Sequence, residues 1–235
     1  MKWLKEGLEL WDIELSPTQE KEFESYRDMI LEWNEKFNIT SLTEEKDMEI
    51  KHFLDSISPL LLKELETTSS VLDMGTGGGF PGIPLKIMKP EWKMVLADSL
   101  NKRIKFLQEV ISELKLKDIE AVHGRAEEMA RKSEFREKFD MVISRAVAPL
   151  PTLAEYCIPF VKVGGFFIAM KGSAAEEELE QAEKAIKILG GKYVRKETIN
   201  IPHLDWQPQL LIIKKVEKTH SKYPRGGGKP RTKPL

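Results

Sequence analysis

A glycine-rich turn preceded by an acidic residue carries the strongest chemical signal in the sequence. The segment reads Asp73-Met74-Gly75-Thr76-Gly77-Gly78-Gly79-Phe80-Pro81-Gly82 and follows a short apolar stretch typical of a buried strand. Because glycine has no Cβ, Gly75, Gly77 and Gly79 allow the backbone to approach a bound ligand closely. The turn therefore predicts a binding site for a nucleotide-like cofactor at the end of this strand.

Two classes of cofactor are compatible with the turn. Gly77, Gly79 and Gly82 satisfy the G-x-G-x-x-G pattern of dinucleotide-binding proteins, so an NAD-dependent or flavin oxidoreductase is one alternative. Asp73 favours another cofactor, because a carboxylate here would repel a pyrophosphate, whereas S-adenosylmethionine has no phosphate and carries an ammonium and a sulfonium. Pro81 also removes an amide donor that a phosphate would use. We therefore predict S-adenosylmethionine as the cofactor.

Two further polar positions suit a cofactor that carries a nucleoside. Asp98 ends the second predicted strand, where its carboxylate can accept hydrogen bonds from both ribose hydroxyls. The same residue could instead cap the helix that follows. Gly124-Arg125-Ala126-Glu127 ends the third predicted strand, where the amide of Ala126 and the carboxylate of Glu127 could meet the adenine edge. A helix start with acids in its first turn is the alternative there.

The segment after the fourth predicted strand lacks the residues of two common kinds of methyl transfer. Ser144 to Pro149 contains no Asn/Asp-Pro-Pro-aromatic turn for an exocyclic amine, and Cys157 lies inside a predicted helix rather than at a nucleophile's position. Guanine N7 needs neither, because its free lone pair requires positioning more than a base. Arg145 could hydrogen-bond guanine O6 or hold the cofactor, or form an ion pair with a neighbouring acid. No residue is assigned as catalytic.

These positions imply an α/β sheet that brings strand ends together. From residue 70, short apolar strands alternate with amphipathic helices, which predicts an α/β fold with a seven-stranded, mostly parallel sheet and helices on both faces. Together with the predicted cofactor, this pattern leads us to expect the Rossmann-like fold of class I S-adenosylmethionine-dependent methyltransferases. In such sheets ligands bind beyond the carboxyl ends of the strands. The predicted strands are Ser70 to Met74, Lys93 to Asp98, Ile119 to His123, Met141 to Ser144, Phe166 to Met170, Tyr193 to Ile199 and Gln209 to Lys215.

Helices are expected before and between these strands. Ser16-Pro17-Thr18-Gln19 combines an N-cap, a first-turn proline and a capping-box glutamine, which predicts a helix start. A further helix is expected from Asp47 to Leu65 with an interruption near Ser58-Pro59, and others at Lys102 to Leu114 and Ala174 to Leu189. We divide the chain into a helical segment packed on the core (1–66), a methyltransferase domain (67–216) and a basic tail (217–235).

Charge and composition restrict the partners. The net charge is −1, yet residues 218–235 hold six basic residues and no acid, which leaves −7 on the rest. This asymmetry suggests contact with a polyanion, although a disordered, solubilising tail would have the same composition. One cysteine excludes an internal disulfide, and no Cys/His spacing supports a metal site. No apolar run reaches the roughly 18 residues of a membrane span, so we expect a soluble, cytoplasmic protein without a membrane partner.

The ordered set of motifs resembles the glucose-inhibited division protein B family, the bacterial 16S rRNA guanine-N7 methyltransferases also called RsmG. The resemblance covers nearly the whole chain. One departure is Gly228-Lys229-Pro230, where family members often carry Gly-Thr-Pro. The matching pieces are Asn38-Ile39-Thr40-Ser41, His52-Phe53-Leu54-Asp55-Ser56, Asp73 to Pro84, Asp98-Ser99, Lys102-Arg103, Phe106-Leu107, Gly124 to Glu127, Ser144 to Ala148, Lys171-Gly172, Tyr223-Pro224-Arg225 and Lys233-Pro234-Leu235.

The resemblance implies that Gly75, Phe80, Ala126, Glu127 and Arg145 contact S-adenosylmethionine. It also implies methylation of one guanine in the decoding region of 16S rRNA, as naked RNA, small subunit or assembly intermediate, with no obligatory protein partner inferred.

His52 and Asp55 belong near the expected cofactor face, and neither is assigned as catalytic. A methyltransferase for a small molecule or a protein, and a binding protein without turnover, remain alternatives to the rRNA enzyme. The cations expected to bind RNA phosphates are Lys102, Arg103, Lys171, Lys222, Arg225, Lys229, Arg231 and Lys233.

Overall fold

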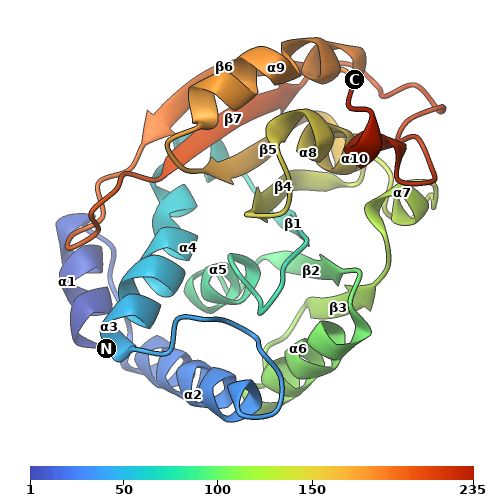
Figure 1. The fold of residues 1–235 in the computed structure, drawn as a ribbon. Coiled ribbons are helices and arrows are strands. Elements are labelled where there is room, and N and C mark those ends of the chain that lie inside the picture. The colour runs from blue at the N-terminus through green and yellow to red at the C-terminus, as the bar shows by residue number, and fades with distance from the viewer.

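A single seven-stranded sheet organises the protein. The computed structural model describes residues 1–235, and its strands follow the order β3-β2-β1-β4-β5-β7-β6 (Figure 1). All pairings are parallel except those of β7 with β5 and β6. The predicted number of strands and the mostly parallel sheet are thus confirmed. The strands are β1 (Ser70–Met74), β2 (Lys93–Asp98), β3 (Ile119–His123), β4 (Phe139–Arg145), β5 (Val161–Lys171), β6 (Gly191–Thr198) and β7 (Gln209–Lys215).

Three strands differ from the predicted bounds. β5 begins five residues earlier than predicted, because Val161 already pairs with Phe139 before an irregularity in the register. Lys162 to Gly164 are exposed, which breaks the apolar pattern used to place the strand. Gly165 fits there because a Cβ on it would meet the carbonyl oxygen of Asp140 at 2.5 Å. β4 is extended at both ends and β6 starts and ends slightly earlier than predicted.

The strand order places the candidate residues at one edge of the sheet. The chain passes outward from β1 through β2 to β3 and then returns to β4 on the other side of β1. The strand order therefore reverses between β1 and β4. In α/β proteins, ligands bind in the crevice at such a reversal, beyond the carboxyl ends of the strands. Parallel register brings Asp73 beside Ile143 of β4, and Asp98 beside His123 of β3. The turns after β1, β2, β3 and β4 therefore meet.

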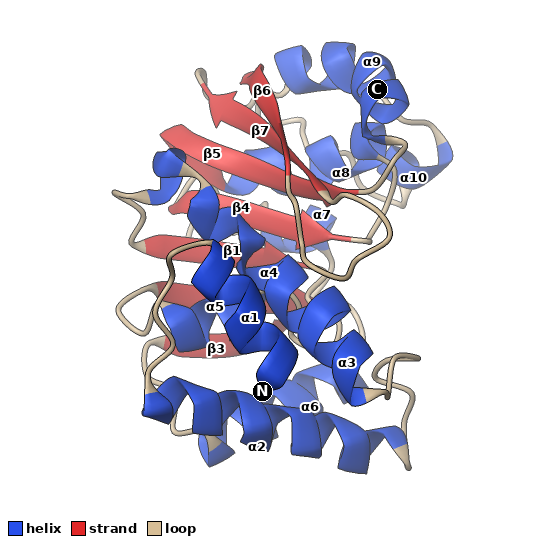
Figure 2. Ribbon diagram, turned by 90° about the vertical axis from the view of Figure 1, so that its left-hand side faces the viewer, coloured by secondary structure: helices blue, strands red, loops and turns tan.

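Helices cover both faces of the sheet. Successive residues of one strand point to opposite faces, so Val71 joins a core with α1, α2, α5 and α6, whereas Leu72 joins a core with α7, α8 and α9. Figure 2 shows α1 and α4 lying across the first of these faces. No helix is long and apolar enough to cross a membrane. The helices are α1 (Lys2–Leu10), α2 (Pro17–Asn34), α3 (Glu45–Asp47), α4 (Asp55–Ile57), α5 (Gly82–Met88), α6 (Asn101–Glu113), α7 (Ala126–Met129), α8 (Leu150–Cys157), α9 (Ala175–Ile188) and α10 (Lys229–Thr232).

The N-terminal helices support the glycine turn. The predicted capping box is present, since the Ser16 hydroxyl accepts from the Gln19 amide and the Gln19 side chain accepts from the Ser16 amide. On the buried face of α2, the Tyr26 hydroxyl donates to the carbonyl of Gly78 at 2.5 Å. Between α3 and α4 the chain makes a π-helical turn, Met48–Leu54. Such turns are often found at functional sites.

The basic C-terminal segment is folded against the body. Arg136 donates to the carbonyl oxygens of Thr219, His220 and Tyr223, and Thr152 donates to that of Pro230. Figure 1 shows α10 beside α8. The interpretation of this segment as a disordered tail is therefore wrong, because fixed side chains of the body bind its carbonyl groups.

Candidate functional site

The glycines of the turn serve different purposes. Gly75 has a φ of +74°, and a Cβ on it would meet Val147 at 2.4 Å, so the residue allows the β1 and β4 turns to approach each other. At Gly79, with a φ of +102°, a Cβ would instead meet Ile83 and the Tyr26 hydroxyl at 2.7 Å. Gly77 donates its amide hydrogen to Asp98 at 3.0 Å. Close approach to a ligand was expected of all three glycines, but of these only Gly75 lines the cavity at the strand ends described below.

Asp73 lies fully buried behind the turn. Its Oδ2 accepts hydrogen bonds from the Thr76 hydroxyl at 2.6 Å and the Gly82 amide at 2.8 Å, whereas its Oδ1 has no partner. Burial raises the pKa of Asp73 to about 7. One oxygen of Asp73 thus holds the turn in shape, and the other leaves an unpaired buried acceptor, an arrangement that costs free energy unless a donor reaches it.

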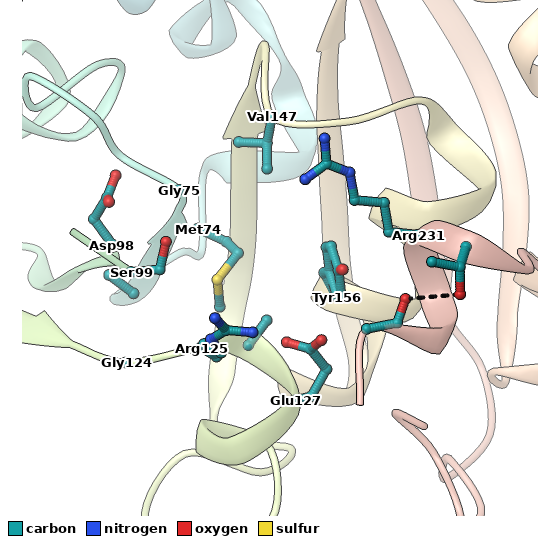
Figure 3. A pocket seen from close by; sticks show the side chains of 14 residues that line it. Met74, Gly75, Asp98, Ser99, Gly124, Arg125, Glu127, Val147, Tyr156 and Arg231 are labelled. Atoms are coloured by element: carbon teal, nitrogen blue, oxygen red, sulfur yellow. Dashed lines mark hydrogen bonds between the residues drawn. The ribbon is translucent and has the colours of Figure 1, made fainter. Parts of the chain in front are cut away.

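A cavity of about 370 Å³ opens at the carboxyl ends of β1, β2 and β3. Its volume falls within the range of small-molecule sites. Figure 3 shows Asp98 and Ser99 on one side, and Glu127, Tyr156 and Arg231 on the other. We call it the cofactor cavity. Its walls are formed by Met74, Gly75, Ala97, Asp98, Ser99, Gly124, Arg125, Ala126, Glu127, Val147, Tyr156, Gly228, Arg231 and Thr232.

Asp98 connects the glycine turn with β2. Its Oδ1 accepts from the Leu100 amide at 2.8 Å, and its Oδ2 accepts from the amide of Gly77 and from Arg103 at 3.2 Å. The N-cap of α6 is Leu100, without a side-chain hydrogen bond, so the interpretation of Asp98 as a helix cap is wrong. Each carboxylate oxygen can accept two hydrogen bonds. Asp98 Oδ1 therefore retains acceptor capacity toward the cavity.

The cofactor cavity has the chemistry that S-adenosylmethionine requires. Met74, Ala97 and Ala126 supply an apolar wall for an adenine ring, and Asp98 supplies an acceptor for ribose hydroxyls. Asp73 lines neither this cavity nor the second one described below, and its unpartnered Oδ1 is a buried acceptor behind the glycine turn that an ammonium group at the turn would use. The residues present thus fit this cofactor.

A second cavity of about 660 Å³ shares Val147 with the first. Its walls come from the π-helical turn, α4, the β4 and β5 ends and the loop between β6 and β7. We call it the acceptor cavity. It is lined by Leu42, Lys51, His52, Asp55, Arg145, Ala146, Val147, Ala148, Pro149, Met170, Lys171, Gly172, Glu178 and Trp206.

Arg145 lines the acceptor cavity and not the cofactor cavity. Its guanidinium donates to Asp55 Oδ2 at 2.6 Å and to the carbonyl of Lys51 and Nδ1 of His52, each at 3.2 Å. The ion pair that the sequence left as an alternative is therefore present. Phe80, predicted to touch the cofactor, lines neither cavity; it packs under the His52 ring at 4.3 Å and the Arg145 guanidinium at 5.1 Å. Neither Arg145 nor Phe80, both predicted to contact the cofactor, therefore lines the cofactor cavity.

The hydrogen bonds of His52 fix its state. Because Nδ1 accepts from Arg145, Nε2 carries the ring proton and donates to the Thr40 hydroxyl at 2.7 Å. Burial, together with the charge of Arg145, lowers the pKa of His52 to about 3. Burial also raises the pKa of Asp55, although Arg145 opposes this. Both nitrogens of His52 are occupied, so the ring positions its neighbours and has no free nitrogen to act as a base.

The predicted RNA-binding cations divide into two groups. Arg103 pairs with Asp98, Lys171 with Glu178 at 2.7 Å, and Arg225 with the buried Glu155 at 2.7 Å. These three are held by acids of the body, which removes charge that a phosphate would use. Arg231 lies on the cofactor cavity wall. The exposed cations that form no ion pair are Lys102, Lys222, Lys229, Arg231 and Lys233.

Sequence reasoning missed several walls of the two cavities. Tyr156 and Trp206 belong to no motif, and only the folded chain brings them to the strand ends. Val147 lies within the motif Ser144 to Ala148, but sequence reasoning assigned it no role of its own. Ser99 directly follows Asp98 and could have been found from that position.

Comparison with known proteins identifies the family. The family described as GidB, rRNA small subunit methyltransferase G, matches residues 19–204. The chain belongs to this family. Proteins named ribosomal RNA small subunit methyltransferase G from Alkaliphilus oremlandii and Lachnoclostridium phytofermentans are 50% and 52% identical to it; the alignments cover 99% and 98% of this chain and 97% and 95% of theirs. The resemblance drawn from the motifs is confirmed.

Solved structures confirm the fold. An O-methyltransferase from Bacillus cereus in complex with SAH matches with a TM-score of 0.60 and 14% identity over 91% of this chain and 99% of that one. The fibrillarin pre-rRNA processing protein of Methanococcus jannaschii matches with a TM-score of 0.52 and 16% identity over 66% and 70%. The chain therefore has the Rossmann-like fold of class I methyltransferases, as predicted.

Proposed function

We propose that this protein transfers a methyl group from S-adenosylmethionine to N7 of one guanine in bacterial 16S rRNA. The observation that carries the proposal is the identity of about half of all residues, along almost the entire chain, with relatives named as small-subunit rRNA methyltransferases. The cofactor cavity supports it, because its residues fit this cofactor at the expected edge of the sheet.

Four residues would hold the cofactor in this proposal. Asp98 accepts hydrogen bonds from the ribose hydroxyls, Ala126 and Glu127 meet the adenine edge, and Asp73 Oδ1 accepts from the ammonium group. When bound, S-adenosylmethionine supplies an electrophilic methyl group on its sulfonium. Gly75 and Val147 separate the two cavities and so set the distance between the cofactor site and the acceptor.

The side chains around the acceptor cavity favour N7 as the acceptor atom. Cys157 is buried, and burial raises the pKa of its thiol well above the ordinary value, so it is unsuited to nucleophilic attack on a pyrimidine. His52 has no free nitrogen for removing a proton from an amine. Guanine N7 carries no proton and needs only to be held in line. The protein's task is then orientation and exclusion of water.

The substrate in this proposal is 16S rRNA, either naked or within a small subunit or an assembling particle, without an obligatory protein partner. Lys102, Lys222, Lys229 and Lys233 are exposed and unpaired, so they bind phosphates. Arg231 lies on the wall of the cofactor cavity, where its guanidinium would contact an RNA phosphate near the reacting base.

The proposal is tested with labelled S-adenosylmethionine, purified protein and RNA from cells that lack the activity. Small subunits and 16S rRNA are compared with 23S rRNA, transfer RNA and protein without RNA. Release of labelled 7-methylguanosine on digestion of 16S rRNA alone is the expected result. Labelled protein or small molecules, or a different labelled nucleoside, would contradict it.

A further inference from the structure

Asp55 is a buried acidic group of the acceptor cavity whose two oxygens are used unequally. Asp55 Oδ2 accepts from Arg145 at 2.6 Å, whereas Oδ1 accepts no hydrogen bond from the protein. The Asp55 side chain is 6% exposed and lines the cavity. Glu178, the other carboxylate on this wall, also uses one oxygen only, because its Oε2 accepts from both Lys171 and the Leu150 amide. The Glu178 side chain is 23% exposed, however, so Asp55 presents the more buried of the two free acceptors.

The position of Asp55 is rigidly set. Arg145 binds it while donating also to Lys51 and His52, and Phe80 packs against both the His52 ring and the guanidinium. A side chain held in this way cannot turn to solvent without breaking a buried ion pair. Its free oxygen is thus a preorganised feature of the cavity.

Guanine is the base whose donors suit such an oxygen. Its Watson–Crick edge carries the N1–H and N2–H₂ donors, whereas adenine has an acceptor at N1 that a carboxylate would repel. N7 lies on the opposite edge of the base. A guanine with N7 toward the cofactor cavity, across Val147, therefore offers its donor edge to the remainder of the acceptor cavity, where Asp55 lies.

An aromatic side chain lies at the same cavity without a role in the core. Trp206, in the loop between β6 and β7, is 44% exposed and lines the cavity together with Pro149 and Met170. Exposed aromatic rings stack well on unpaired bases, and enzymes that modify a base commonly take it out of its stack. Trp206 can therefore cover a base that enters the cavity.

We propose that the acceptor cavity binds the target guanine, with Asp55 Oδ1 accepting from its N1–H and N2–H₂ donors and Trp206 stacking on its face. This inference rests on the proposed function and extends it by naming the residues that distinguish guanine from other bases. Asp55 and Trp206 are positioning and specificity residues, since neither touches the methyl group.

The first test compares RNA carrying guanine at the target position with RNA carrying inosine, which keeps N7 and N1–H but lacks the 2-amino group. For the wild-type protein we expect kcat/KM to fall about tenfold or more with inosine, since one hydrogen bond to a charged group is lost. In Asp55→Asn the ratio of the two rates should approach one. The ratio is measured within each variant, so general damage from the lost Arg145 ion pair cancels.

Glu178→Gln is the matched control, because it removes a carboxylate charge from the same cavity wall and also breaks an ion pair. It should keep the wild-type ratio. For stacking, Trp206→Ala should raise KM for RNA about tenfold, Trp206→Phe should restore it, and cofactor affinity should stay constant in both, because Trp206 does not line the cofactor cavity.

Two results would overturn the inference. Equal rates on guanine and inosine RNA with the wild-type protein would exclude recognition of the 2-amino group, whether or not Asp55→Asn folds. If Asp55→Asn kept the wild-type ratio of rates on guanine and inosine RNA, Asp55 would be excluded from recognition of the 2-amino group. Absence of methylation on guanine RNA would instead contradict the proposed function, and the inference with it.

Discussion

Replacing Asp73 with asparagine should change stability and cofactor binding in opposite directions. The native protein favours the protonated carboxyl, with a pKa of about 7, whereas the unfolded chain ionises near the ordinary 3.8. Asp73 therefore contributes stability at low pH, and this contribution is lost as the pH rises from about 4 through 7. At 1.36 kcal/mol per pH unit, the separation of the two values corresponds to about 4 kcal/mol.

Asparagine retains an oxygen for Thr76 and Gly82 but does not ionise. As the pH rises from 4 to 8, wild type should thus lose stability that Asp73→Asn keeps. Relative to wild type, the free energy of unfolding of the variant should increase by up to about 4 kcal/mol. The variant places an amide where the free oxygen lies. Loss of a charge-assisted hydrogen bond to the cofactor's ammonium should weaken binding by about tenfold to a hundredfold.

Urea unfolding across this pH range and calorimetric titration with S-adenosylmethionine provide the two measurements. Asp118→Asn, at an exposed position, is the control and should change neither. If Asp73→Asn tracked wild type at every pH and bound the cofactor equally well, the argument from the buried unpaired oxygen would be wrong.

Two further predictions concern acid stability and RNA binding. The pKa of His52 lies near 3 in the native state and near 6.5 when unfolded, so the protein loses stability as the pH drops below 6.5. His52→Gln should lose about 3 kcal/mol less stability than wild type between pH 7 and 4.5. Urea midpoints that fall in parallel for both proteins would refute this. Changing Lys222, Lys229 and Lys233 together to serine should lower the salt dependence of RNA affinity by about 2 to 3 in log–log slope without weakening cofactor binding, and an unchanged slope would exclude these lysines from phosphate contact.

The lysine substitutions test the C-terminal segment better than truncation. Removing residues after Glu217 would also remove Arg231 and Thr232 from the cofactor cavity and leave the buried Glu155 without Arg225. A truncated protein could therefore lose activity through its cofactor site and not through RNA binding.

The sheet was predictable because its strands are short apolar runs bounded by turns. β1, β2, β3 and β7 have the predicted bounds, because polar residues inside them, such as Asp73 and Glu120, stand singly between apolar ones. β5 was shortened in the prediction because its first residues are exposed and contain two glycines, so its pairing with β4 depends on the neighbouring strand and not on local composition.

The positions of the site residues were more predictable than their contacts. Asp73 and Asp98 lie at the strand ends as expected, but whether a carboxylate faces a ligand or its own turn depends on neighbours far away in sequence. Arg145 points to Asp55, ninety residues earlier. Trp206 and Tyr156 reach the cavities from elements that carry no motif. Such contacts depend on how distant elements pack together, and motif spacing along the chain does not predict that packing.

The most direct test of the account locates the methyl group on the RNA. After reaction with labelled S-adenosylmethionine, 16S rRNA from cells lacking the activity is cleaved chemically at 7-methylguanine, and the break is mapped by primer extension. The account predicts one break, at a single guanine, that requires both the protein and the cofactor. Label without such a break, or breaks at many guanines, would contradict methylation of one N7 position.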